Sequence, residues 1–427
     1  MSHLPRRTLG AALLAAFVHS SASAWSQFPT LEPNQIIGPS AEEITPPQTW
    51  LFGQTVSLRE KTAFIGMPAT PESPGRVAIF SREHDRWERT GTLLPSDSFP
   101  GDSFGLDITG SGERWLFISK HAYRRSGGEW REVGLLQGLG VTAVAAEGDT
   151  LFSSGYVGTF STGYADNNKV KVFKVENDGS LTLTQILSPG ADVQDDFSFG
   201  ASIAVSHDTL VLNRYAKSAV YIFVRHGDQW VEQQKLVGKP QSGFGYGIAL
   251  DDDILLATGP RPQQCPVGSR GGGALVVFVR VRGVWTERQT IEGDCESMNF
   301  AESLALRAGV LAIGMTTYFG TAGFYEQTIL YQWNGHEFEP AATAFAQHAS
   351  EGPVVVSLSD WQLFLSYPYV PNDPSKNVFV GHSEIFDLQH CRFGEAPSGE
   401  TPPSTLKENP IALARLCHPR DEREAPH

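Results

Sequence analysis

Short stretches of alternating hydrophobic residues recur along the chain, each followed by a polar turn and a second such stretch. The first arm of each pair is rich in β-branched and aromatic residues, which is typical of a β-hairpin. In the clearest copies an aromatic residue precedes a tryptophan by seven positions: Phe80 and Trp87, Tyr123 and Trp130, Phe223 and Trp230, Phe278 and Trp285. The same step recurs less strictly as Tyr331 and Phe338, Phe386 and Phe393, and Phe173 and Leu181.

A second motif opens each of these units. Four openings are Phe52-Gly53, Phe104-Gly105, Phe199-Gly200 and Phe244-Gly245, and three weaker ones are Leu139-Gly140, Phe300-Ala301 and Glu351-Gly352. Two apolar runs joined by a short turn follow each opening, as at 200–205 and 209–212. Each unit thus holds four short strands, and seven units predict an all-β fold, a seven-bladed β-propeller of four-stranded antiparallel blades.

An array of β-sandwiches and a β-solenoid are the alternatives. A solenoid needs regular coils of about 20–30 residues without blade-like hairpins. Here the distance between openings varies from 35 residues (104 to 139) to 60 (139 to 199), and every unit contains a hairpin signal. The pattern therefore favours the propeller.

The two ends of the chain differ from the repeats. Residues 1–24 resemble a signal peptide: Arg6-Arg7, an apolar run at 9–18, and Ala22-Ser23-Ala24 as a cleavage pattern. The arginine pair also partly matches a twin-arginine signal, so the export route stays open. We expect 25–50 to be a lead that adds a closing strand, 51–394 to be the propeller and 395–427 to be a tail rich in proline and charge. The mature protein is expected in the periplasm or outside the cell.

The repeats resemble the FG-GAP family, including exported bacterial members and, more distantly, the propeller of integrin α chains. The best copy is Phe199-Gly200 with 201–205, 208–212 and 219–223. Members usually end the second strand with Gly-Ala-Pro, which here becomes Ile65-Gly66-Met67-Pro68 and Thr258-Gly259-Pro260. The resemblance covers roughly residues 50–394 and implies the fold, but propellers host many unrelated activities.

Charge narrows the range of partners. Removing the two arginines of the signal from the 33 basic residues leaves 31 against 47 acidic ones, a net charge of −16. Such a chain repels nucleic acid and anionic membranes, and no later stretch reaches the eighteen or so apolar residues of a spanning helix. We therefore expect no nucleic-acid partner and no membrane insertion.

The connections between second and third strands vary most in length, and rigid scaffolds tend to carry function in such loops. They contain aromatic and charged residues suited to a protein or glycan ligand. The candidates are Tyr156, Tyr164, Asp166, Arg261, Arg270, Tyr318, Tyr325, Tyr367 and Asp373. The alternative is that these side chains only pack the loops against one another.

The sequence lacks the metal-binding loops of integrin-like members and the common catalytic motifs. Integrin-like members carry calcium loops between first and second strands, but here those turns are short, as at Glu147-Gly148-Asp149, and Asp251-Asp252-Asp253 is best read as a solvated turn. No His-Glu-x-x-His, Gly-x-Ser-x-Gly or Cys-x-x-Cys motif occurs. We predict no metal, no cofactor and a binding function. A polysaccharide-active enzyme is the alternative, which two carboxylates at the channel mouth would favour.

Four cysteines in an exported chain are compatible with two disulfides. Cys265, in the second-to-third connection of the fifth blade, and Cys295, in the connection leaving that blade, emerge on the same face. Cys391, expected in the third-to-fourth turn of the seventh blade, would then pair with Cys417 in the tail. The repeated residues Trp87, Trp130, Trp230 and Trp285 are expected to pack between blades, and Arg82, Arg125, Arg225 and Arg280 to pair with acids or lie on strand surfaces.

Overall fold

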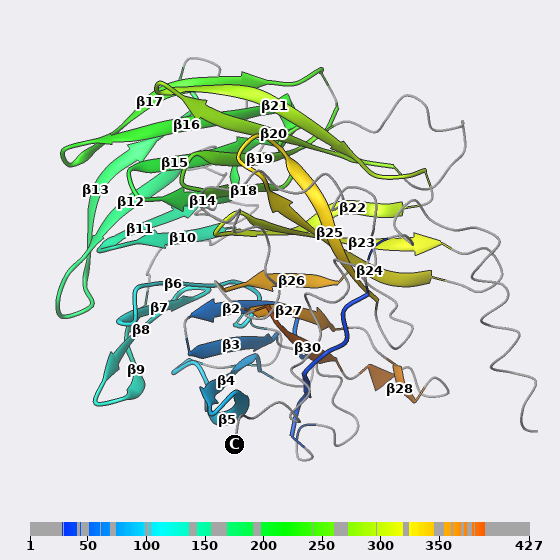
Figure 1. Ribbon diagram of the computed structural model, residues 1–427. Helices are drawn as coiled ribbons and strands as arrows, with labels where there is room; N and C mark the ends of the chain where they lie inside the picture. Colours follow the sequence, from blue (N-terminus) through cyan, green and yellow to red (C-terminus); the bar gives the residue numbers. More distant parts are fainter. Residues whose placement is uncertain are drawn as a thin grey trace, which may run out of the picture.

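Seven four-stranded antiparallel sheets form a seven-bladed β-propeller, which confirms the predicted fold class (Figure 1). The computed structural model describes residues 28, 30–40, 43, 51–59, 61–68, 74–97, 99, 102, 104–135, 143–154, 169–190, 198–240, 242–259, 272–295, 297–318, 324–345, 354–359, 362–368, 371–373, 378–379 and 381–388. Among these residues, no helix is long and apolar enough to cross a membrane. The predicted signal peptide and tail lie outside them.

Six blades are each built from four consecutive strands. The first holds β2–β5 (Thr55–Arg59, Thr62–Met67, Arg76–Glu83, Arg86–Leu93), the second β6–β9 (Ile108–Ser111, Trp115–Ile118, His121–Ser126, Glu129–Leu135) and the third β10–β13 (Ala143–Glu147, Thr150–Ser154, Val170–Val175, Leu181–Leu187). The fourth holds β14–β17 (Phe199–Ser206, Thr209–Arg214, Ala219–His226, Gln229–Val237), the fifth β18–β21 (Ile248–Asp251, Ile254–Gly259, Ala274–Val281, Val284–Glu292) and the sixth β22–β25 (Ser297–Arg307, Val310–Tyr318, Phe324–Trp333, Phe338–Phe345).

The seventh blade combines both ends of the propeller. It contains β26 (Val355–Leu358), β27 (Gln362–Tyr367), β30 (His382–Asp387) and, in the fourth position, β1 (Gln35–Ile37). A small hairpin of β28 (Pro371–Asp373) and β29 (Val378–Phe379) lies between β27 and β30 in the chain, and a 3-10 helix, η1 (Tyr215–Lys217), joins β15 to β16.

The first strands of neighbouring blades contact one another in the closed order β2, β6, β10, β14, β18, β22, β26 and back to β2. First strands therefore line the centre, and fourth strands form the rim. Because strands alternate in direction, the second-to-third connections and the links between blades emerge at one end, which we call the loop-rich face. The first-to-second and third-to-fourth turns emerge at the opposite face.

The N-terminal lead closes the ring. β1 pairs with β30 in antiparallel register, from Gln35 opposite Ile385 to Ile37 opposite Ser383. The expectation that the step from Phe386 to Phe393 supplies this fourth strand is therefore wrong, because β1 already occupies the outer edge of β30. The same finding removes the basis for placing Cys391 in a third-to-fourth turn.

The lead also contacts the two blades on either side. The backbone N–H of Leu31 donates to the carbonyl of Thr343 in the sixth blade at 2.7 Å. In the first blade, Arg89 donates to both carboxylate oxygens of Glu43, at 2.6 and 2.7 Å. The lead thus joins three blades at the seam of the ring.

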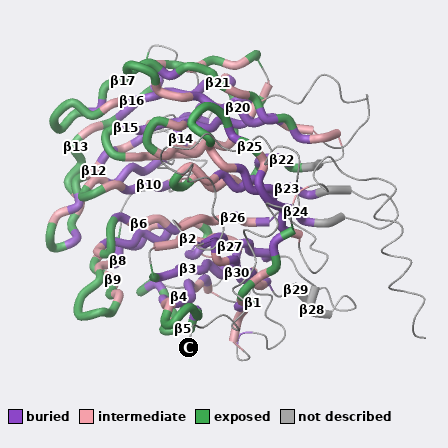
Figure 2. The backbone as a smooth tube through the Cα atoms, in the orientation of Figure 1, coloured by how far each residue is buried: buried purple, intermediate pink, exposed green. Residues whose placement is uncertain are grey.

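The second strands are buried along their length and lie inside each sheet (Figure 2). Aromatic side chains fill the spaces between neighbouring blades. The repeated tryptophans contact phenylalanines of the preceding blade edge-on, with ring centroids at 5.1 Å for Trp87 and Phe364, 5.3 Å for Trp130 and Phe64, and 5.1 Å for Trp230 and Phe152. Three of the repeated arginines pair with acids, Arg82 with Asp387, Arg125 with Glu113 and Arg280 with Asp253. These repeated residues therefore stabilise the scaffold.

The Phe-Gly openings have a conformational cause. Gly105 adopts a φ of +88°, and a Cβ there would lie 2.9 Å from the carbonyl oxygen of Arg76 in the preceding blade. Glycine alone adopts this conformation without strain. The weaker sixth opening keeps the same left-handed backbone with an alanine, Ala301, at a φ of 63°.

A bulge follows each repeated tryptophan or its equivalent in six blades. In the fourth blade the register shifts between Ile222 and Phe223, so that Glu232 opposes Phe223 and Gln234 opposes Ile222. Because one residue is skipped, Gln234, four positions after Trp230, faces the next blade instead of the preceding one.

This reorientation creates a repeated contact that we call the glutamine clamp. The side-chain amide of Gln234 donates to the backbone carbonyl of Trp285 at 2.8 Å and accepts from its N–H at 2.9 Å. The same pair of bonds, at 2.8–2.9 Å, joins Gln35 to Trp87, Gln185 to Trp230 and Gln289 to Phe338. The clamp satisfies the rim-facing N–H and C=O of a fourth strand, groups that would otherwise lack a protein partner.

Candidate functional site

Most of the predicted ligand residues cannot be placed. Tyr156, Tyr164, Asp166, Arg261 and Arg270 lie outside the described residues. The backbones of Tyr318 and Tyr325 lie at the end of β23 and the start of β24, where Tyr325 opposes Thr317. Asp373 lies in β28 opposite Val378. Tyr318 and Tyr325 thus belong to the strands that flank the second-to-third connection of the sixth blade, and Asp373 lies within that connection of the seventh.

Tyr367 occupies a different environment from the exposed loop expected for it. Its side chain is 1% exposed and belongs to the hydrophobic core between the sixth and seventh blades. Its ring lies 5.2 Å from that of His382, the residue opposite it in β30. Its hydroxyl is not available at the surface, so for Tyr367 the structure fits the packing alternative.

An aromatic pair that sequence reasoning missed lies on the loop-rich face. Tyr215 begins η1 in the fourth blade, and Tyr246 lies in the link that leads into β18 of the fifth blade. Their ring centroids are 5.3 Å apart with an interplanar angle of 67°. Tyr246 is 59% exposed, although an aromatic ring gains free energy from burial. The pair therefore presents an aromatic surface to solvent where two blades meet.

A buried amide holds the Tyr246 backbone in place. Asn213, at the end of β15, is fully buried, and its side-chain nitrogen donates to the carbonyls of Gly245 at 3.0 Å and Tyr246 at 3.1 Å. Its side-chain oxygen accepts from the N–H of Ser202 at 2.7 Å. Because both N–H groups and the oxygen of the Asn213 amide are bonded within the fold, the exposed ring sits on a rigid support.

Two further exposed apolar groups belong to the same face. Leu106 occupies, in the second blade, the repeat position that Tyr246 occupies in the fifth, two residues after the opening phenylalanine, and is 51% exposed. Phe99, in the link from the first to the second blade, is 53% exposed. Exposed large apolar side chains on connections mark candidate contact surfaces on an otherwise acidic protein.

Carboxylates also lie near this face, but they are buried between blades. Glu326 of β24 is 1% exposed and accepts from the hydroxyl of Thr316 at 3.1 and 3.2 Å. Burial raises its pKa to about 7, with a smaller contribution from the charge of Glu302, while hydrogen bonds from Thr316 and the backbone of Val354 oppose the shift. A substrate on the surface could not reach this carboxylate directly.

Glu384 completes this buried cluster from the seventh blade. It is 0% exposed, and one of its oxygens lies 3.5 Å from Nε2 of His382. Burial, together with the negative charges of Glu384 and Glu326, raises the pKa of the Tyr367 hydroxyl well above its usual value. Glu326, Glu384 and the hydroxyl of Tyr367 are therefore all buried at the interface between the sixth and seventh blades.

At the mouth of the channel on the loop-rich face the described acids are Asp107, directly before β6, and Glu302, in β22. Burial raises the pKa of Asp107 to about 7, opposed by a hydrogen bond from the backbone of Val144 in the next blade. Glu302 is exposed, and partial desolvation raises its pKa. Asp107 thus joins two blades, whereas Glu302 is open to solvent.

A histidine between two carboxylates lies in the second blade, at the link from the first. His121, 2% exposed, places Nδ1 3.0 Å from Glu132 and Nε2 3.2 Å from Asp97. The nearby hydroxyl of Ser96 donates to Glu132 at 2.8 Å, so it is not aligned with the imidazole as a nucleophile would be with its base. This cluster ties the link to β8 and does not have the arrangement of a hydrolytic triad.

Within the part of the chain that the structure describes, no group of three His, Cys, Asp or Glu side chains could hold a metal ion. Cys295 forms a disulfide bond. Its partner lies outside the described residues, as do Cys265, Cys391 and Cys417, so both predicted pairings stay predictions.

No protein-family model and no curated protein sequence matches the chain. A candidate 6-phosphogluconolactonase from Bacteroides uniformis has a similar structure at 13% identity and a TM-score of 0.45, covering 72% of this chain and 89% of that one. The periplasmic gluconolactonase PpgL of Pseudomonas aeruginosa follows at 11% identity and 0.42, covering 67% and 84%. Kluyveromyces lactis Hsv2 matches at 11% identity and 0.43, covering 77% and 96%. TM-scores this low carry no argument about ligand or activity.

Proposed function

We propose that the protein is an exported, non-enzymatic binding module that recognises a glycan or protein through the loop-rich face of its propeller. The observation that carries the proposal is the exposed Tyr246 ring, paired with Tyr215 and held by the buried Asn213. A rigid aromatic group that loses little conformational freedom is a typical centre of recognition. Export rests on the signal-like residues 1–24, and assignment to the FG-GAP family rests on the repeat motifs.

The acids support this choice over catalysis. Two carboxylates at the channel mouth would favour an enzyme, but of the two described there Asp107 is desolvated by burial and bonded to the backbone of Val144, so Glu302 alone is exposed. Glu326 and Glu384 are at most 1% exposed. Carboxylates buried to this extent cannot transfer protons to a bound sugar, because a general acid or base must come within hydrogen-bonding distance of its substrate.

The test uses the mature protein from residue 25, applied to a glycan array and to a pull-down from extracellular fractions. Any ligand found is then measured against Tyr246→Ala, which should lower affinity at least about tenfold if the ring is a main contact. Val237→Ala is the matched control, since Val237 is 66% exposed but lies on the rim strand β17. Equal loss of affinity in both variants, or none in Tyr246→Ala, would contradict the proposal.

A hydrolase or lyase acting on polysaccharide is the second candidate. It rests on Glu302, an exposed acid with a raised pKa beside Glu326. Turnover of a polysaccharide panel by the mature protein, abolished in Glu302→Gln with unchanged melting temperature, would establish this candidate instead.

A further inference from the structure

The space between the first and second blades lacks a glutamine clamp. The residue four positions after Trp87 is Gly91, opposite Ile79 after the bulge, where the third, fourth and fifth blades place glutamine. The residue that a glutamine here would reach is Trp130, which is only partly buried, whereas Trp87, Trp230 and Trp285 are 2–4% exposed. Because position 91 has no side chain, nothing from the first blade occupies the position of the clamp beside Trp130.

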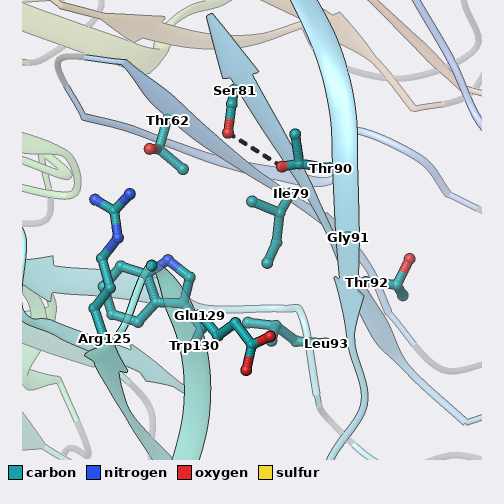
Figure 3. A pocket seen from close by; sticks show the side chains of 11 residues that line it. Thr62, Ile79, Ser81, Thr90, Gly91, Thr92, Leu93, Arg125, Glu129 and Trp130 are labelled. Atoms are coloured by element: carbon teal, nitrogen blue, oxygen red, sulfur yellow. Dashed lines mark hydrogen bonds between the residues drawn. The ribbon is translucent and has the colours of Figure 1, made fainter.

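A pocket of about 430 Å³ occupies this position, between β4 and β5 of the first blade and the β8–β9 hairpin of the second. Gly91 lies on one side, Trp130 with Arg125 on the other, and Ile79 between them (Figure 3). Thr62, Ser81, Thr90, Thr92, Leu93, Gly128 and Glu129 complete the lining. The apolar floor suits methylene groups, and the rim is polar.

The backbone of Trp130 offers the same pair of groups that the clamp uses elsewhere. Arg125, opposite Trp130, directs its own N–H to the carbonyl of Arg114, in the turn directly before β7. Arg125 and Trp130 are therefore a non-hydrogen-bonded pair of the antiparallel ladder, and the Trp130 N–H and C=O point to the rim. Among the described residues, no side chain hydrogen-bonds to either group.

The chemistry of these two groups selects the ligand. One donor beside one acceptor matches a primary carboxamide, which carries both a carbonyl and an NH₂ group. A carboxylate can accept from the N–H but cannot donate to the carbonyl. Among the described residues, a glutamine of a β-strand makes this pair of hydrogen bonds four times. A glutamine side chain presented by an extended segment therefore fits the backbone groups of Trp130.

We infer that the pocket between Gly91 and Trp130 is a docking site for a glutamine side chain presented by an extended segment of a partner protein. The glutamine completes the clamp that the first blade omits, with its methylene groups against Ile79 and its amide on the Trp130 backbone. The site is separate from the proposed ligand surface, since Tyr215 and Tyr246 lie between the fourth and fifth blades and this pocket lies between the first and second.

The protein itself supplies a probe and a blocking substitution. The probe is a fluorescein-labelled peptide with the β21 sequence, residues 284–292, whose Gln289 clamps Phe338 in the fold. Gly91→Gln should fill the pocket from within, because a Cβ at Gly91 would meet nothing closer than Ile79 at 3.5 Å and the backbone there has no left-handed φ. Gly134→Gln is the matched control at the same repeat position of the second blade, with its nearest neighbour 3.9 Å away.

Fluorescence anisotropy should show saturable binding of the probe to the unsubstituted protein. Binding should weaken at least about tenfold when the glutamine of the peptide, which corresponds to Gln289, is replaced by glutamate, and again in Gly91→Gln, but not in Gly134→Gln. The melting temperature of Gly91→Gln should not fall, which separates blocking from unfolding. No saturable binding at about 1 mM peptide, equal binding of the glutamate peptide, or undiminished binding to Gly91→Gln would each overturn the inference.

Discussion

Replacing Gln234 by alanine removes one glutamine clamp and leaves the rest of the blade intact. The substitution deletes two hydrogen bonds, to the carbonyl and from the N–H of Trp285, at 2.8 and 2.9 Å. Each such bond contributes about 0.5–1.5 kcal/mol net, so the free energy of unfolding should fall by about 1–3 kcal/mol. The loss cannot be much smaller, because the freed backbone groups face a partly buried space between two blades.

This loss in the free energy of unfolding corresponds to a measurable drop in the melting temperature. For the roughly 280 described residues the entropy of unfolding is about 0.6 kcal/mol/K, so the midpoint should drop by about 2–5 °C. Circular dichroism or calorimetry of the mature protein measures this directly. Gln233→Ala is the control, since Gln233 is the exposed neighbour skipped by the bulge and should leave the midpoint unchanged. Identical midpoints for the two variants would refute the clamp as a stabilising contact.

Three further predictions concern charge and covalent closure. The hydrogen bonds from Arg89 and Ser40 and the charge of Arg89 outweigh burial and hold the pKa of Glu43 at about 2. The ionised carboxylate therefore contributes about 2–3 kcal/mol to the free energy of unfolding above pH 4.5, and this contribution is lost as the pH falls toward 2. Glu43→Gln should lower the free energy of unfolding at pH 7 and reduce its dependence on pH between 4.5 and 2, as measured by unfolding at a series of pH values. The pKa of Glu326 is raised to about 7, so stability should decline as pH rises from about 4.5 to 7, and Glu326→Gln should remove part of that decline; an unchanged pH profile would contradict the assignment. Peptide mapping of the unreduced protein should link Cys265 to Cys295, and a bond from Cys295 to either other cysteine would disprove the pairing.

The sequence allowed the number of blades and the interior aromatic positions to be predicted, because both depend on contacts close in the chain. The seven-residue step from Phe223 to Trp230 spans a single hairpin, and a hairpin has few geometries. The glutamine clamp was not predicted, although Gln234 and Gln289 each follow a tryptophan by four residues. Its partner lies about fifty residues away in another blade, and it forms only because a bulge turns the glutamine to the other face.

The candidate site was less accessible to sequence reasoning. Attention to the longest loops singled out Tyr367, which is buried, and passed over Tyr215 and Tyr246, which lie in short connections 31 residues apart. Loop length indicates where insertions are tolerated and does not show which side chains remain exposed after the blades pack. Tyr246 was nevertheless visible as a large aromatic directly after a Phe-Gly opening, where the four other openings that begin with phenylalanine carry Gln54, Leu106, Ala201 and Glu302.

Closure of the ring by β1 sets an order for folding. The hydrogen bond from the N–H of Asp387 to the side chain of Asn34 spans 353 residues, and the ion pair of Arg82 with Asp387 spans 305. Contacts this distant in the chain form slowly, since a long segment must first be brought into place. During synthesis the lead emerges first and remains without its strand partner until the last blade is complete. A chain released before β30 would therefore keep an open sheet edge at the seam, exposed to aggregation and proteolysis, even with six blades fully formed.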